Sequence, residues 1–239
     1  MDVIQAKGQD HRTLNEAIRQ TECCTVQGCM GQRFLGAGMK NVHMELEGIP
    51  GNALGAYLAG AEIFVHGNAQ DAVGDTMNDG RIVINGSAGD AVGYAMRGGR
   101  IYIRGSAGYR AGIHMKAYRE KQPLIIIGGR TGSFLGEYQA GGVIIVLGLH
   151  TDGKPIVGNF PCTGMHGGKM FLRGTAEGII FPKNVCVKPA DADDLAGISG
   201  YLADYCAAFG MNAEVLMRSP FTVITPDTAN PYKQLYVAN

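Results

Sequence analysis

The chain has little of what membrane proteins, nucleic-acid-binding proteins and most enzymes need. Among its 239 residues there is no tryptophan, and Lys+Arg and Asp+Glu both number 21, so the formal net charge is zero. A balanced charge gives no electrostatic basis for binding nucleic acid or an anionic membrane. The longest apolar runs have the length of strands, and no apolar signal segment opens the chain. We therefore expect a cytoplasmic protein with neither a nucleic-acid nor a membrane partner.

The cysteines lack the spacing of a metal site. The chain contains no C-x-x-C pair and no Cys/His spacing of a zinc site, so we expect buried free thiols and no metal ion. There is also no nucleophile elbow, no H-E-x-x-H motif and no arrangement of paired carboxylates, so no catalytic residue is assigned. The six cysteines are Cys23, Cys24, Cys29, Cys162, Cys186 and Cys206.

Glycine is what the chain has in excess. Its 37 glycines amount to about twice average usage, and they recur at a fixed interval. Successive segments start at Gly48, Gly67, Gly86 and Gly105, each nineteen residues after the last. A second glycine follows seven residues into each segment, at Gly55, Gly74, Gly93 and Gly112. Because tight corners often need a left-handed backbone and close approach, we predict that these four glycines are structural.

Apolar residues keep the same period. They occur in pairs, four and two residues before each starting glycine, and this period-2 pattern is typical of strands. The segments leave no room for the crossover helices of βαβ units. We therefore predict an all-β fold, a right-handed parallel β-helix solenoid of about seven to eight coils with short terminal helices. The pairs are Met44/Leu46, Ile63/Val65, Ile82/Ile84, Ile101/Ile103, Leu124/Ile126, Ile144/Val146 and Met170/Leu172.

The solenoid is expected to occupy residues 28–188. Residues 1–27 form an N-terminal segment with a short capping helix, opened by a capping box at Thr13–Glu16. Residues 189–239 form a C-terminal helix, over Asp191–Phe209, and a tail that pack on the solenoid. Two coils are too long, by four and by seven residues, and insertions in solenoids usually leave the core as loops.

The longer insertion contains the side chains that most resemble metal ligands: His150, Asp152, Cys162 and His166. Their spacing matches no standard metal site. The G-x-x-x-x-G-K match over residues 148–154 is followed by Pro155, where a phosphate-binding loop has Ser or Thr. We therefore interpret these residues as exposed loop residues, with no cofactor bound by this chain.

One row of side chains is not explained by an isolated solenoid. Three residues before each starting glycine a side chain should point outward, and that row is apolar. A contiguous apolar stripe is uncommon on a free-standing soluble protein. Either the chain's own helix near residues 195–209 covers the row, or a partner subunit or a second copy does, which makes the row a candidate interface. Its members are Phe64, Val83, Tyr102, Ile125, Ile145 and Phe171.

The repeat resembles the GXGXG domain of the large subunit of glutamate synthase. The pattern G-x-A-G-D-x-x-G-x-x-M-x-G-G-x-I-x-I-x-G appears most clearly from Gly86 to Gly105, and the resemblance extends from about residue 28 to about 188. The segment Asp10–Ile18 is similar to the one that precedes the β-helix in glutamate synthases. The segment Asn230–Tyr236 resembles the tail of free-standing versions of the domain.

The resemblance implies a scaffold subunit, non-catalytic alone. In glutamate synthases a glutaminase releases ammonia, a barrel carrying FMN and iron–sulfur clusters uses it to aminate 2-oxoglutarate, and the β-helix holds the two together. The chain opens Met1-Asp2-Val3, without the N-terminal cysteine nucleophile of the glutaminase, so both activities and both cofactors are expected in partner subunits. Self-association is also possible. The alternatives are the equivalent subunit of N-methylglutamate synthase, the similar β-helical subunit of formylmethanofuran dehydrogenase, and an independent β-helix enzyme that uses the long loop.

Overall fold

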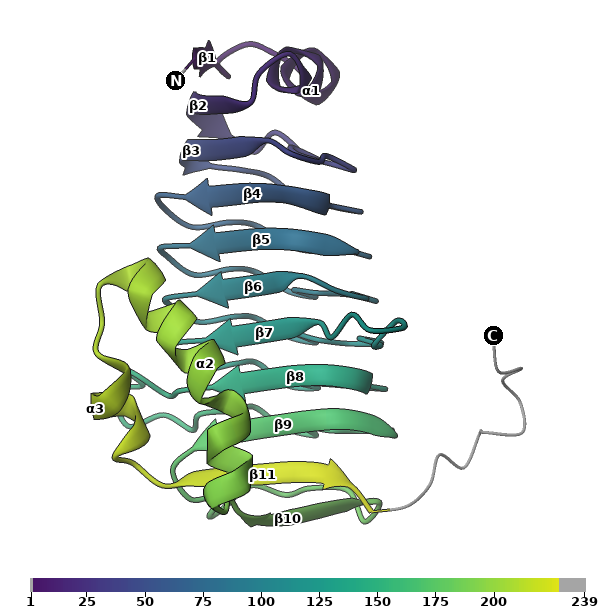
Figure 1. Ribbon diagram of the computed structural model, residues 1–239, viewed down its shortest axis with the longest axis vertical. Helices are drawn as coiled ribbons and strands as arrows, with labels where there is room; N and C mark the ends of the chain where they lie inside the picture. Colours follow the sequence, from purple (N-terminus) through teal and green to yellow (C-terminus); the bar gives the residue numbers. More distant parts are fainter. Residues whose placement is uncertain (1, 228–239) are drawn as a thin grey trace.

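Short strands stack on one another along the length of the molecule (Figure 1). The structure is a computed structural model and describes residues 2–227, so the resemblance noted for Asn230–Tyr236 lies outside the described residues. One 11-stranded sheet has the order β1 to β9, then β11, then β10. The strands are β1 Asp2–Gln5, β2 Cys23–Met30, β3 His43–Ile49, β4 Ala59–Val65, β5 Asp79–Ile84, β6 Arg100–Ile103, β7 Leu124–Ile127, β8 Ala140–Val146, β9 Gly167–Arg173, β10 Val185–Pro189 and β11 Phe221–Pro226.

Neighbouring strands from β1 to β9 pair in parallel, and this confirms the predicted parallel β-helix. The C-terminal end departs from the repeat, because β11 inserts antiparallel between β9 and β10. A pair of antiparallel strands thus ends the stack, and β10 is its edge strand.

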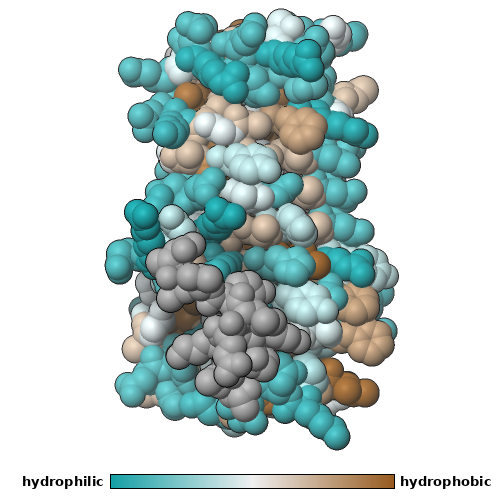
Figure 2. Space-filling view, turned by 90° about the vertical axis from the view of Figure 1, so that its right-hand side faces the viewer, coloured by the Kyte–Doolittle hydropathy of each residue, from teal (hydrophilic) through white to brown (hydrophobic). Residues whose placement is uncertain are grey.

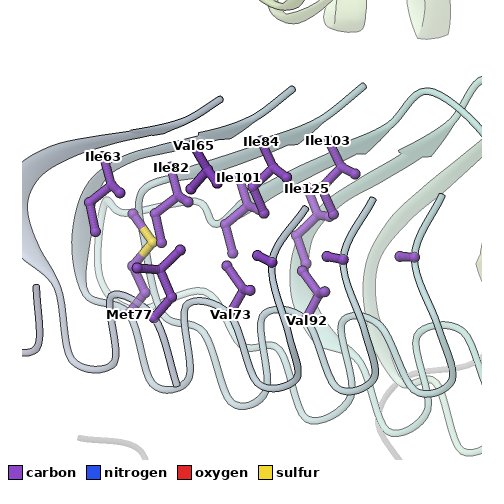
Figure 3. Packing of buried hydrophobic residues seen from close by; sticks show 14 of the residues in the cluster. Ile63, Val65, Val73, Met77, Ile82, Ile84, Val92, Ile101, Ile103 and Ile125 are labelled. Atoms are coloured by element: carbon purple, nitrogen blue, oxygen red, sulfur yellow. The ribbon is translucent and has the colours of Figure 1, made fainter. Parts of the chain in front are cut away.

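Equivalent isoleucines lie on top of one another in the core. Ile63 pairs with Ile82, and Ile82 pairs with Ile101, so each coil buries the side chain of the one before. Figure 3 shows this ladder with Met77 and Val73 facing it from the opposite wall. Most of these side chains are fully buried, as expected for core residues at a nineteen-residue period. A second column at one position of successive coils is buried as well, and comprises Met39, Leu58, Met77, Met96 and Met115.

At the four predicted structural glycines, both the backbone conformation and the packing of the core require glycine. Their φ angles lie between +63° and +70°, the left-handed region. A Cβ added to Gly93 would lie 2.4 Å from Cδ1 of Ile125, the core isoleucine of the next coil. The same collision, at 2.4 to 2.6 Å, occurs at Gly55, Gly74 and Gly112. Each coil thus leaves out a side chain where the next coil places an isoleucine.

The G-x-A-G-D motif is explained by hydrogen bonds between coils. Backbone N–H groups of one coil donate to polar side chains of the coil before it. Ser106 donates to Ser87 Oγ at 3.1 Å, and Tyr109 donates to Asp90 Oδ1 at 2.8 Å. Ala88 of the same motif is buried. The motif therefore specifies stacking rather than chemistry.

The predicted register of one coil is wrong. Leu124 and Ile126 were expected inside, but Ile125 and Ile127 pair with the core residues Ile101 and Ile103. Gly129, rather than Gly128, forms the corner, since its N–H donates to Gly105 O at 2.7 Å. That coil therefore spans 24 residues and its insertion is five residues long, not four. A shift of one residue exchanges the two faces of a strand, so Ile125 belongs to the core and Ile126 to the outer row.

Helices cover the N-terminal end and one side of the solenoid. α1 (His11–Arg19) begins before the predicted capping box, because Asp10 is its N-cap and accepts from the N–H groups of Arg12 and Thr13. Two side chains of α1, Leu14 and Ile18, join the core. α2 (Ala192–Phe209) matches the predicted helix, with Asp191 as N-cap and Gly210 left-handed at φ +64°. The short α3 (Ala213–Met217) leads into β11.

Candidate interaction surfaces

The apolar outer row is largely covered by the chain's own helix α2, which crosses the face of the sheet (Figure 1). Val83, Tyr102, Ile145 and Phe171 are at most 4% exposed. They form a second hydrophobic cluster with the α2 side chains Ile198, Leu202, Tyr205 and Cys206. The Tyr205 hydroxyl donates to Ile103 O at 3.2 Å, and its ring meets Tyr102 edge to face at 5.8 Å.

This placement changes the candidate interface. Ile125 leaves the row for the core, and Ile126 takes its place under α2. Phe64 is the one member of the predicted row that remains half-buried, at the border of the covered area. The sequence left open whether the chain's own helix or another subunit covers the row. The structure shows that α2 covers Val83, Tyr102, Ile145 and Phe171. These four side chains are therefore not accessible on the surface of the molecule.

Charged side chains fix the N-terminal end of α2 to the solenoid. Asp194, only 8% exposed, lies 3.1 Å from Lys169 Nζ of β9 and 3.2 Å from Lys188 Nζ of β10. Burial raises the pKa of Asp194, but hydrogen bonds from both lysines outweigh burial and lower it overall. Asp191 also bonds Lys188, which lowers its pKa to about 2.

The long insertion does not assemble its polar residues. The interpretation of Cys162 as an exposed loop residue is wrong, because it is a core residue whose Sγ lies 3.5 Å from Met170 Sδ, and burial raises its pKa to about 12. His166 Nδ1 lies 3.0 Å from Gly164 O, whereas His150 and Asp152 are exposed loop side chains. Within residues 2–227 no group of three or more His, Cys, Asp or Glu is placed to hold a metal.

The insertion instead forms a wall of a small apolar pocket of about 170 Å³. No titratable side chain lines this pocket, so it offers no acid, base or nucleophile. The independent-enzyme alternative, which needs a reactive group at the long loop, gains no support from this geometry. The side chains that line the pocket are Pro155, Val157, Asn159, Phe160, Ile179 and Ile180.

A polar patch that was not predicted from the sequence occupies the outer face of β3 and β4, beside Phe64. His43 Nδ1 lies 3.3 Å from Glu62 Oε2, and His66 Nε2 lies 2.9 Å from Glu45 Oε2. Arg81 of β5 joins Glu62 at 3.2 Å. These pairs link consecutive coils in partly exposed positions, where each is worth little to stability. The signal available in the sequence was the alternation of charged and apolar residues along each strand.

A second missed feature is a ladder of rings at the corner where turns lead into strands. The ring centroids of Tyr94 and His114 lie 6.0 Å apart, and those of His114 and Tyr138 lie 5.1 Å apart in nearly parallel planes. Figure 2 views the side on which the strands begin, where pale and brown side chains occur among hydrophilic ones along the molecule. His114 and Tyr138 each lie two residues after the middle glycine of their coil, and Tyr94 lies one residue after Gly93, so the sequence signal was a ring close to that glycine in neighbouring coils.

Comparison with known proteins places the repeat in a family. Residues 3–221 match the family model described as the GXGXG motif. The chain belongs to the GXGXG family. This GXGXG protein is 41% identical over 249 residues to an uncharacterized protein, MJ1350, of Methanocaldococcus jannaschii, and the match covers 98% of the chain and 95% of that relative.

Among solved structures, the GXGXG protein is similar in fold to a chain of the formyltransferase/hydrolase complex FhcABCD from Methylorubrum extorquens, determined with methylofuran. The TM-score is 0.63 at 21% identity, covering 83% of this chain and 71% of that chain. No helix within residues 2–227 of the GXGXG protein is long and apolar enough to cross a membrane.

Proposed function

We propose that this GXGXG protein is a scaffold subunit of a multisubunit amidotransferase flavoenzyme of the glutamate synthase type. The observation that carries the proposal is the family match along residues 3–221, on a solenoid whose interior is filled with stacked apolar side chains. A filled interior leaves function to the outer surface, which is long, rigid and built in repeating steps. Such a surface suits the binding of other chains at fixed separations.

In this proposal the partners are a glutaminase-type subunit and a synthase-type subunit. The FMN and the iron–sulfur clusters lie in the synthase-type subunit, and the glutamine-hydrolysing nucleophile lies in the glutaminase-type subunit. This chain contributes the binding surfaces and no catalytic residue. The buried thiols of Cys29 and Cys162 support that division, because burial raises the pKa of each, to about 11 and about 12, and so disfavours the reactive thiolate.

A second candidate keeps the scaffold role and changes the chemistry. The similar solved chain belongs to a formyltransferase/hydrolase complex, so this protein would be the equivalent subunit of a complex that handles a formyl group, such as formylmethanofuran dehydrogenase. The corresponding subunit of N-methylglutamate synthase is a third possibility of the same kind. All of these assign the chain to a scaffold and differ in the partners it binds.

Co-expression with the proteins encoded beside its gene tests the proposal. We expect a glutaminase-type and a flavin-binding protein to co-purify with the chain, to elute together in size-exclusion chromatography, and to convert glutamine and 2-oxoglutarate to glutamate with a reductant. The chain purified alone should lack flavin absorbance and glutaminase activity. Co-purification of formyl-transferring partners would assign the second candidate, and stoichiometric flavin on the isolated chain would contradict the scaffold role.

A further inference from the structure

The small apolar pocket beside the long insertion belongs to a larger apolar patch at the C-terminal end of the solenoid. Phe160 and Ile180 line the pocket and are 60% and 86% exposed. The Phe160 ring also meets the Phe134 ring, with centroids 5.4 Å apart, so the patch continues onto the preceding coil. Single exposed apolar side chains are common on soluble proteins, whereas several that surround one pocket favour a covering segment.

The pocket has the size and the chemistry of a site for one apolar side chain. Its volume is about 170 Å³, and an apolar cavity of about 150 Å³ is large enough to hold benzene. Asn159 is the polar side chain among those that line it. A polar or charged occupant would lose its hydration there without gaining enough hydrogen bonds in return. The pocket therefore favours an aliphatic or aromatic occupant.

The described part of the chain ends close to this pocket. Asp227 donates its backbone N–H to Asn184 O at 2.9 Å, and Asn184 Nδ2 donates to Met165 O, also at 2.9 Å. Asn184 follows Ile180 of the pocket wall by four residues, and Met165 follows Phe160 by five. Because four residues span at most about 14 Å, Asp227 lies within about 20 Å of the pocket.

Twelve residues follow Asp227, and this C-terminal segment is long enough to reach the pocket. Eight extended residues span up to about 27 Å, so Leu235 can reach a site about 20 Å from Asp227. The segment has one charged side chain, Lys233, and its apolar side chains include Tyr232, Leu235 and Tyr236. A segment with so little charge is complementary to a pocket that no titratable side chain lines.

We propose that the C-terminal segment, residues 228–239, binds back onto the solenoid and covers this patch, with Leu235 as the side chain that fills the pocket. Leucine suits the pocket better than the neighbouring tyrosines, because a buried hydroxyl needs a hydrogen-bond partner and the pocket wall is apolar. The segment shields Phe160 and Ile180 from water. These contacts lie within one chain, so they do not depend on the proposed scaffold function.

A tryptophan probe tests this placement, since the chain contains no tryptophan of its own. In full-length Leu235→Trp we expect a blue-shifted emission maximum and protection from acrylamide quenching, because the indole enters the pocket. Phe160→Asp and Ile180→Asp should each abolish both effects, so that the emission resembles that of the urea-unfolded protein. The matched control is Met30→Asp, since Met30 is 87% exposed and lies on β2, at the opposite end of the sheet.

A second measurement leaves the pocket unaltered and decides the case in which indole is too large to enter it. Hydrogen exchange followed by mass spectrometry compares the wild-type chain with Leu235→Asp, and with the control Gln234→Asp, which adds the same charge one residue earlier. We expect faster exchange of residues 155–160 and 176–181 in Leu235→Asp and unchanged exchange in the control. If the indole of Leu235→Trp is exposed to solvent, this difference supports docking and its absence overturns the inference.

Two further outcomes overturn the inference. A buried indole that neither Phe160→Asp nor Ile180→Asp releases means that the segment docks elsewhere on the chain. Burial that depends on protein concentration, together with a dimer in sedimentation velocity, assigns the pocket to the segment of a second copy. Circular dichroism checks that the pocket variants fold, and Phe160→Ser and Ile180→Ser replace any that do not. An indole that is buried at all concentrations and released by the pocket variants supports docking within one chain.

Discussion

At the scale of single residues, the core is built from a glycine of one coil and the isoleucine of the next. Gly93→Ala should cost about 1–2 kcal/mol for its left-handed backbone and about 1–3 kcal/mol for overpacking, because the new Cβ meets Ile125 Cδ1 at 2.4 Å. Denaturant unfolding measures the sum. The control Gly38→Ala has φ +67° and open space around it, so only the backbone cost is expected.

A double mutant separates these two costs. Ile125→Val removes the colliding Cδ1 atom and should cost about 0.5–1.5 kcal/mol alone. In the Gly93→Ala background it should restore part of the stability instead. Simple additivity of the two changes would contradict the packing explanation, and equal losses from Gly38→Ala and Gly93→Ala would do the same.

The buried thiols give the second prediction, on reactivity and alkaline stability. Exposed Cys186 should react with a thiol reagent at once, and buried Cys29 and Cys162 only upon unfolding. Burial raises the pKa of Cys29 to about 11 and of Cys162 to about 12, from an ordinary value of 9.0. Their contribution to stability is thus full below pH 9, and decreases as the pH rises toward 11 and 12, since the unfolded thiols ionise first.

Denaturant unfolding at a series of pH values measures this effect. Cys162→Ser and Cys29→Ser should flatten the alkaline decline, whereas Cys186→Ser should leave it unchanged. Rapid labelling of Cys162 in the folded protein would refute the assignment of that residue to the core.

Most of the core and corner residues could be predicted from the sequence, because the nineteen-residue period gives each of them its place in the coil. The exception is Ile125. Residues 124–127 are all apolar, so alternation carries no signal there, and the pair Gly128–Gly129 offers two equally good corners. Only the hydrogen bond from Gly129 to Gly105 determines which glycine is used. Similarly, Tyr94, His114 and Tyr138 can be recognised as neighbours only when the register of every coil is known.

At the scale of elements, α2 is the part of the fold whose place the sequence left open. Helical spacing and the capping residues predict its bounds, but a periodic pattern does not say which surface its apolar face covers. The structure answers this by packing Leu202 and Tyr205 on the outer row of the sheet. Because α2 also leads into β11, which pairs with β9, its docking is linked to the closure of the C-terminal end.

We predict that Leu202→Asp releases α2 from the sheet. Leu202 is fully buried, so the carboxylate would lose hydration without a partner, at a cost of about 3 kcal/mol or more. Increased binding of a hydrophobic dye and rapid proteolysis between residues 191 and 220 should accompany the loss. The control Ala203→Asp, at an exposed position, should change stability by no more than about 0.5 kcal/mol. Equal effects of the two substitutions would argue against the observed helix orientation.

At the scale of the whole molecule, coils should be interchangeable. Deletion of residues 67–85 removes one nineteen-residue coil and brings Phe64 to the place of Val83 below α2. We expect cooperative unfolding at a lower temperature, measured by circular dichroism, because each coil contacts mainly its neighbours. Deletion of residues 67–76 removes fewer residues but half a coil, so it should prevent folding. A folded half-coil variant would mean that the ladders do not determine the register.

The regular stack also fixes distances along the molecule. The eleven strands within residues 2–227 are separated by ten steps of about 4.8 Å each, or about 48 Å in all. Two groups attached at different coils are thus held at a separation that changes only in whole steps. Removing one coil would bring them closer by about 4.8 Å, which is enough to move a donor and an acceptor out of alignment without altering either binding surface. The number of coils, and not only their sequence, would then be under selection.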